Sequence, residues 1–139
     1  MNDNPLAKKL LIRSGSRLLV RNAPPRYLEK LEPLPDGVQL LTAVEGTFDV
    51  VLQFVHNKAE VDSLALESVL AARLGGVAWM IYPKKSKNVQ TDINRDTGWD
   101  VLWDAGWVGI AIAAIDEAWA ALRFRPASDV KRSPNSTLR

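Results

Sequence analysis

Three lysines gather in one predicted loop, which follows an apolar segment and precedes a predicted helix. The loop is expected at the carboxyl edge of a parallel sheet, where open α/β folds bind ligands. Cations and hydroxyl groups beside a helix N-terminus suit phosphate or carboxylate, because the side-chain charges and the helix dipole have one sign. The residues expected to contact an anionic small molecule or an acidic protein surface are Asn22, Lys84, Lys85, Ser86, Thr91, Asp92 and Arg95.

A solvated loop is the simpler interpretation of these lysines, which include Lys87. No GxxxxGK[ST] frame surrounds them, so nucleotide hydrolysis is not indicated.

Two adjacent carboxylates, Asp116 and Glu117, are expected in the turn before Trp119. Asp116 is a further candidate ligand contact, since it could face the same edge as Lys84 and Lys85, and a salt bridge that closes the hairpin is the alternative. Adjacent side chains on a strand point apart, which argues against a matched acid and base.

The single histidine, His56, follows a predicted strand at the carboxyl edge, a position where general bases are often found. A set of Asp49, His56 and either Ser63 or Ser86 is the Ser/His/Asp arrangement that the sequence allows. A structural histidine is the simpler interpretation. We predict no catalytic residue, no cofactor and no metal ligand.

Four aspartates recur every four residues in the predicted helix over 91–105, namely Asp92, Asp96, Asp100 and Asp104. On a helix they form one stripe and repel one another by about 0.2–0.5 kcal/mol per pair. A basic partner or a hard cation would offset this cost, and exposure to water is the simpler interpretation. Calcium prefers converging loop oxygens, which a helical stripe lacks.

Trp99, Trp103 and Trp107 follow the same four-residue spacing. Core positions are expected for most of them. If Trp99 or Trp103 were exposed beside the acidic stripe, a homodimer or partner interface would be the better interpretation, because tryptophan is enriched at binding hot spots.

The composition is that of one globular domain: 139 residues, 47% apolar and 24% charged, with no cysteine. The absence of cysteine fits a reducing compartment. The first residues lack the apolar core of a signal peptide, and no apolar run is long enough for a membrane span. We therefore expect a cytoplasmic protein without membrane contact.

The coarse pattern alternates strands with helices. It predicts helices over 5–12, 27–31, 58–74 and 91–105, and strands over 17–21, 38–42, 48–55, 77–82, 107–115 and 119–125. Gly75-Gly76 is expected to end the third helix, and 107–115 reads as a central strand.

This alternation predicts an α/β three-layer sandwich with a mostly parallel, Rossmann-like sheet that ends in an antiparallel hairpin. Residues 1–126 are expected to form the domain, and 127–139 a disordered basic tail.

The order of elements, with Phe48-Asp49 in one strand and Leu74-Gly75-Gly76 before the next, resembles the class I methyltransferase fold that binds S-adenosylmethionine. The likeness spans residues 6–125. The chain departs from that family at its glycine-rich cofactor loop, where it has Asn22-Ala-Pro-Pro25, and at the ribose carboxylate, unless Glu45 substitutes for it.

A second resemblance rests on Tyr82-Pro-Lys-Lys-Ser86, Thr91-Asp92, Arg95-Asp96 and the segment from Asp116 to Phe124. These motifs are similar to those of a family of small bacterial proteins that are described only as domains of unknown function. This resemblance implies a bacterial, intracellular protein and no particular activity.

Three functions are left open by the sequence. The first is a non-catalytic binding or interaction module on a degenerate methyltransferase-like fold. The second is an S-adenosylmethionine-dependent methyltransferase in which Asn22, Glu45 and Asp49 replace the usual cofactor contacts. The third is nucleic-acid binding through the basic loop and tail, which the five acidic residues and absence of Lys or Arg in 96–122 make the least expected.

Overall fold

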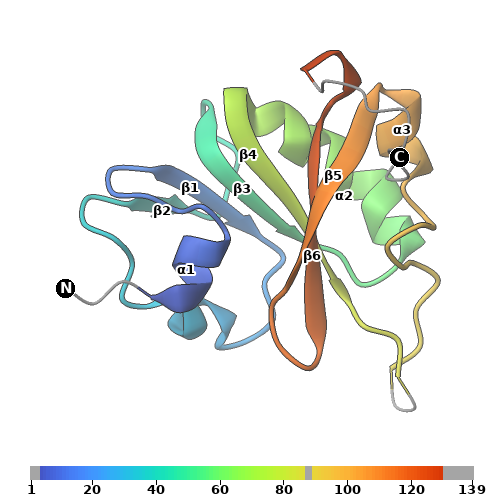
Figure 1. Cartoon of the computed structure of the whole chain (residues 1–139), viewed down its shortest axis with the longest axis horizontal. Helices are drawn as coiled ribbons and strands as arrows, with labels where there is room; N and C mark the ends of the chain where they lie inside the picture. Colours follow the sequence, from blue (N-terminus) through green and yellow to red (C-terminus); the bar gives the residue numbers. More distant parts are fainter. Residues whose placement is uncertain (1–3, 87–88, 130–139) are drawn as a thin grey trace.

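The computed structural model describes residues 4–86 and 89–129 of the chain. The helices in this part are α1 (Pro5–Lys9), α2 (Lys58–Ala71), α3 (Asp100–Asp104) and the 3-10 helices η1 (Tyr27–Leu31) and η2 (Ala127–Asp129). The strands are β1 (Arg17–Arg21), β2 (Gln39–Leu41), β3 (Phe48–Phe54), β4 (Ala72–Pro83), β5 (Trp107–Ala114) and β6 (Trp119–Pro126). They form one sheet in the order β2-β1-β3-β4-β6-β5 (Figure 1).

The sheet confirms the predicted α/β fold class. β1 pairs in parallel with β2 and β3, and β3 pairs in parallel with β4, whereas β6 is antiparallel to both β4 and β5. Long apolar runs become the central strands because both of their faces are covered. The burial of almost every residue of β3 shows this directly.

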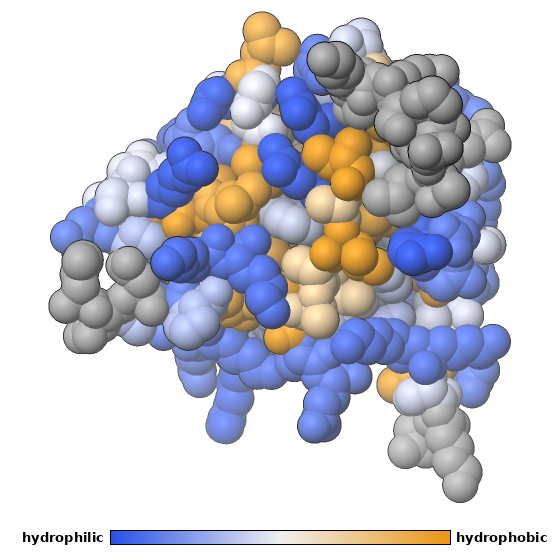
Figure 2. Space-filling model, in the orientation of Figure 1, coloured by the Kyte–Doolittle hydropathy of each residue, from blue (hydrophilic) through white to orange (hydrophobic). Residues whose placement is uncertain are grey.

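Helices cover both faces of the sheet, which makes three layers. Leu10 after α1 and Tyr27 of η1 belong to the core on one face, whereas Val61 of α2 and Leu102 of α3 belong to the core on the other. α2 lies behind the strands in Figure 1. On the near face, apolar residues reach the surface among hydrophilic ones (Figure 2), because the helices on this face are short.

The chain reverses direction across the sheet between β1 and β3. From β1 it moves outward to β2, and it then returns across β1 to form β3 on the other side. In an open α/β sheet, a reversal of this kind leaves a crevice at the carboxyl ends of the two diverging strands. A ligand site is therefore expected at the ends of β1 and β3.

The predicted helix over 91–105 is wrong in its first half, since α3 begins only at Asp100. The Asn94 side chain accepts a hydrogen bond from the N–H of Asp96, and the backbones of Asn94 and Thr97 pair with each other. Such local bonds compete with a helix. Gly98 has φ +102°, and a Cβ there would come within 2.3 Å of Ile93.

The predicted acidic stripe is wrong for the same reason, because the four aspartates do not lie on one helix. Asp92 and Asp96 lie in the loop, and only Asp100 and Asp104 of the series lie on α3. Within the described residues, no three acidic or histidine side chains are placed to hold a metal ion.

The transition from α2 to β4 also differs from the prediction. The helix passes directly into the strand at Ala72, so Gly75 and Gly76 lie inside β4 and do not end the helix. A Cβ on Gly76 would stand 2.9 Å from the carbonyl oxygen of Arg73. The glycine therefore permits a close backbone approach within the strand.

The tryptophans occupy different environments. Trp99 is fully buried and packs its ring 5.7 Å from that of Tyr82 and 5.4 Å from that of Phe124. Trp103 and Trp107 are partly buried against the same core. The core interpretation of Trp99 is confirmed, and an interface built on an exposed Trp99 is excluded.

The last two strands also differ from the prediction. β5 was expected to be a central strand, but β6 inserts between it and β4, so β5 forms the edge of the sheet. Of the predicted tail, residues 127–129 form η2 and the remainder lies outside the described residues. No helix of the described part has the length and apolar character of a membrane span.

Candidate functional site at the carboxyl edge of the sheet

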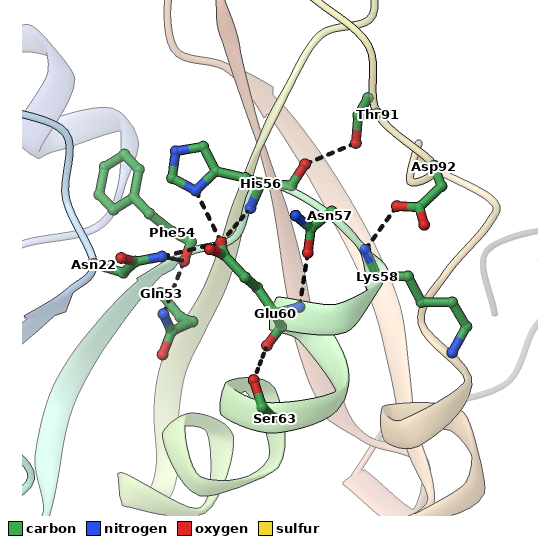
Figure 3. A network of polar contacts seen from close by, with 10 residues as sticks. All are labelled: Asn22, Gln53, Phe54, His56, Asn57, Lys58, Glu60, Ser63, Thr91 and Asp92. Atoms are coloured by element: carbon green, nitrogen blue, oxygen red, sulfur yellow. Dashed lines mark hydrogen bonds and ion pairs between the residues drawn. The ribbon is translucent and has the colours of Figure 1, made fainter.

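Asn22 occupies the turn where the chain leaves β1, with φ +61°. Asparagine tolerates this left-handed conformation better than most residues. Its side-chain amide donates to the carbonyl oxygen of Phe54 and to the Glu60 carboxylate, both at 3.1 Å. Asn22 therefore ties the end of β1 to the end of β3 and to the start of α2 (Figure 3).

Glu60 is the centre of this network. Its Oε1 atom accepts a hydrogen bond from the N–H of His56 at 2.7 Å and lies 2.8 Å from the ring Nδ1 of the same residue. Burial alone would raise the pKa of Glu60, but the hydrogen bonds from His56 and Asn22 outweigh burial and lower this pKa. An ionised carboxylate only accepts, so Nδ1 of His56 carries the proton that faces it.

The start of α2 explains why these groups meet. Asn57 caps the helix by accepting a hydrogen bond from the N–H of Glu60 at 2.9 Å, and Glu60 reaches back to the N–H of His56. The Asn57 bond satisfies a donor that the first turn of the helix leaves free, and the Glu60 bond holds the residue before the cap. The cap thereby fixes His56 at the reversal point of the sheet.

Thr91 and Asp92 join the same network from the loop after β4. The Thr91 hydroxyl donates to the carbonyl oxygen of His56 at 2.8 Å, and Asp92 accepts from the N–H of Lys58 at 2.7 Å. The sequence predicted that a separate helix begins at this point, over 91–105. Thr91 and Asp92 stabilise the beginning of α2 instead, where a carboxylate is favourable for the helix dipole.

A second cluster surrounds Asp116 in the turn between β5 and β6. Its carboxylate accepts from the N–H groups of Ala118 and Trp119 at 2.8 and 2.9 Å and pairs with Lys30 at 3.0 Å. Burial alone would raise the pKa of Asp116, but these contacts outweigh it and lower the pKa. The Lys84 ammonium donates to the carbonyl oxygen of Asp116 at 2.8 Å.

Aromatic rings connect the two clusters. The Trp119 ring lies 5.4 Å from those of His56 and Phe54, and the Tyr27 ring lies 4.6 Å from that of Phe54. The Tyr27 hydroxyl is buried without a hydrogen-bond partner among the described residues. Burial, aided by the negative charge of Asp116, raises the pKa of this hydroxyl.

The structure thus gathers five of the eight predicted site residues into two clusters at one edge: Asn22, Thr91 and Asp92 in one, and Lys84 and Asp116 in the other. Lys85 and Ser86 are exposed, and Arg95 contacts its neighbour Asp96 at 3.4 Å. Lys87 and Asn88 lie outside the described residues.

Two central members were not on the predicted list, Tyr27 and Glu60. Glu60 had a usable signal, because Asn57 followed three residues later by a glutamate resembles a capping box. Tyr27 had none, since only the fold brings η1 beside the turn that holds Asp116.

The alternative residues for a cofactor and for a triad lie elsewhere. Asp49 accepts a hydrogen bond from the N–H of Arg17, the first residue of β1, so it lies at the amino edge of the sheet. Glu45 lies there as well, because its carbonyl oxygen accepts from the Arg17 side chain. Asp49 therefore cannot join His56 in a triad.

The chain is similar to known proteins in its fold but not in its sequence. No protein-family model and no curated protein sequence matches the chain. Among solved structures, DhpI in complex with SAH is similar with a TM-score of 0.52 at 15% identity, over 88% of this chain and 83% of that one. DhpI in a SAM-HEP complex gives 0.51 at 16% identity, over 88% and 85%.

A protein of the NADB-Rossmann superfamily from Streptococcus agalactiae is similar with a TM-score of 0.54 at 10% identity, over 91% of this chain and 69% of that chain. Identities this low establish the fold alone. The chain has a methyltransferase-like Rossmann fold, whereas membership of the small bacterial family stays a prediction.

The residues at the ends of β1 and β2 do not fit an S-adenosylmethionine site of the kind that the fold implies. The Asn22 amide is already engaged with Phe54 and Glu60, and the two prolines that follow have no N–H to offer. Glu45, the substitute for a ribose carboxylate, lies by Arg17 at the opposite edge.

Proposed function

We propose that the protein is a non-enzymatic binding module that takes an anionic small molecule at the carboxyl edge, beside Lys84 and Asp116. The observation that carries the proposal is the state of Lys84. Its ammonium is partly buried and donates to a carbonyl oxygen, and no carboxylate of the described residues forms an ion pair with it. A partly desolvated cation without a counter-charge favours an anionic ligand.

The surroundings of Lys84 support the same ligand class. The Asp116 carboxylate is held by Lys30 and by two N–H groups of its own turn, so its charge is already compensated. Lys85 is exposed next in the sequence and adds a second cation. The buried Tyr27 hydroxyl interacts electrostatically with Asp116 and has no hydrogen-bond partner among the described residues, so it could bond a ligand.

The test is a titration of the 15N-labelled protein with inorganic phosphate at constant ionic strength, read from the backbone amide signals. We expect saturable shifts at residues 84–86 and 116–119. In Lys84→Met, affinity at these signals should fall about tenfold to hundredfold, because a hydrogen bond between charged groups is lost. Lys8→Met, an exposed lysine on α1, should bind as the parent does. Shifts that Lys84→Met leaves unchanged would refute the proposal.

Methyl transfer is the second candidate, and the comparisons favour it because DhpI, which shares the fold, has been captured with SAH and with SAM. A ligand that binds only the folded state raises its stability. From the geometry at β1 and β2, we expect no rise in the thermal midpoint with millimolar S-adenosylmethionine or S-adenosylhomocysteine. Micromolar binding by calorimetry would overturn the non-enzymatic proposal and make the search for a methyl acceptor the next step.

A further inference from the structure

A separate cavity of about 520 Å³ lies at the amino edge of the sheet, at the opposite end of the strands from the site above. It opens where β1, β3 and β4 begin. Its polar lining consists of Arg13, Ser14, Ser16, Asp49, Arg73 and Arg123. A volume of this size is within the range of small-molecule sites, which is about 300–1,000 Å³.

The charges in this cavity do not balance. Arg73 contacts Asp49 at 2.5 Å, and the other oxygen of Asp49 accepts from the N–H of Arg17 at 2.8 Å. The hydrogen bond from the Arg17 N–H and the contacts with Arg73 lower the pKa of Asp49, so it stays ionised. Three arginines against this one carboxylate leave two positive charges, on Arg13 and Arg123.

Arg123 is the most unusual of the lining residues. It projects from β6 on the face that carries α1, directly opposite Trp79 of the core. Its Nε atom is buried and has no hydrogen-bond partner among the described residues. Loss of water around the guanidinium, with repulsion from Arg125, lowers its pKa. A buried donor on a charged group destabilises a fold unless something accepts from it.

We infer that this cavity binds a small molecule through a phosphate group, with Arg123 and Arg13 as its principal contacts. A guanidinium presents donors in a planar fork that matches phosphate oxygens, and two of them supply the charge of a dianion. Ser14 and Ser16 also line the cavity. The site is independent of Lys84 and Asp116, so neither proposal rests on the other.

The experiment observes the Nε–Hε signal of Arg123 in the 15N-labelled protein during titration with inorganic phosphate. We expect a saturable shift of this signal in the parent protein and in Lys84→Met. In Arg13→Gln, phosphate affinity at this signal should fall about tenfold to hundredfold. A signal that does not respond, or that responds equally in Arg13→Gln, would overturn the inference.

Arg123→Met supplies an independent readout. Because it removes a partly buried guanidinium whose Nε lacks a partner among the described residues and keeps a long apolar stem, we expect its thermal midpoint to rise in phosphate-free buffer. Phosphate should raise the thermal midpoint of the parent and of the control Arg26→Met. In Lys84→Met the remaining rise is due to the amino-edge cavity alone. This part of the rise should be missing in Arg123→Met. A midpoint that falls in phosphate-free buffer would show that Arg123 stabilises the empty protein, contrary to the inference.

Discussion

Replacing Trp99 with alanine is expected to lower the free energy of unfolding by about 3–5 kcal/mol. The side chain is fully buried, packs against the rings of Tyr82 and Phe124, and donates from its indole nitrogen to the carbonyl oxygen of Asn94 at 2.7 Å. Alanine would leave a cavity and an unpaired carbonyl together. Urea denaturation measures the loss as a shift of the midpoint at constant slope.

Trp107→Ala is the matched control for this substitution. Trp107 begins the edge strand β5 and is only partly buried against the same core, so its truncation should cost clearly less than that of Trp99. Equal losses at the two positions would mean that the loop before α3 is held by something other than Trp99.

The strands were predictable because their signal is local. Runs such as Phe48–Phe54 are mostly apolar, and this pattern marks a strand that is buried on both faces under helices. The position of β5 was not predictable in the same way. A long apolar run predicts burial, but whether the next strand inserts beside it or beyond it depends on pairing between distant segments.

The loop before α3 shows a different limit. Aspartates at four-residue spacing resemble a helical face, yet Asn94 and Gly98 are residues that favour turns. The prediction followed the spacing of the aspartates, whereas the turn-forming residues determine the structure of this loop. The consequence is functional, because Thr91 and Asp92 are then free to bond the start of α2.

The place of the candidate site was predictable, but its partners were not. Residues that follow parallel strands meet at one edge, so Asn22, Thr91 and Lys84 could be assigned to that edge from sequence order alone. Which of them touch depends on side chains from η1 and from α2. The contacts of Tyr27 and Glu60 are of this second kind.

Replacing Glu60 with alanine is expected to lower the free energy of unfolding by about 2–3 kcal/mol at pH 7, because donors from Asn22 and His56 lose a charged acceptor together. The folded pKa of Glu60 is lowered, so its contribution is present above the unfolded pKa, about 4.3, and is lost as the pH falls through the folded value. Urea denaturation between pH 7 and pH 3 should therefore show the two proteins converging in acid.

Asp62→Ala on the same helix is the control that separates loss of the Glu60 hydrogen bonds from loss of one negative charge on α2. Asp62 pairs with Lys58 one turn away at 2.9 Å on an exposed surface, and such pairs contribute about 0.3–0.5 kcal/mol. If Glu60→Ala cost no more than Asp62→Ala, the bonds to Asn22 and His56 would be surface contacts without consequence. A larger loss for Glu60→Ala that disappears in acid would instead show that ionised Glu60 holds the ends of β1 and β3 together, at the reversal point of the sheet beside Lys84 and Asp116.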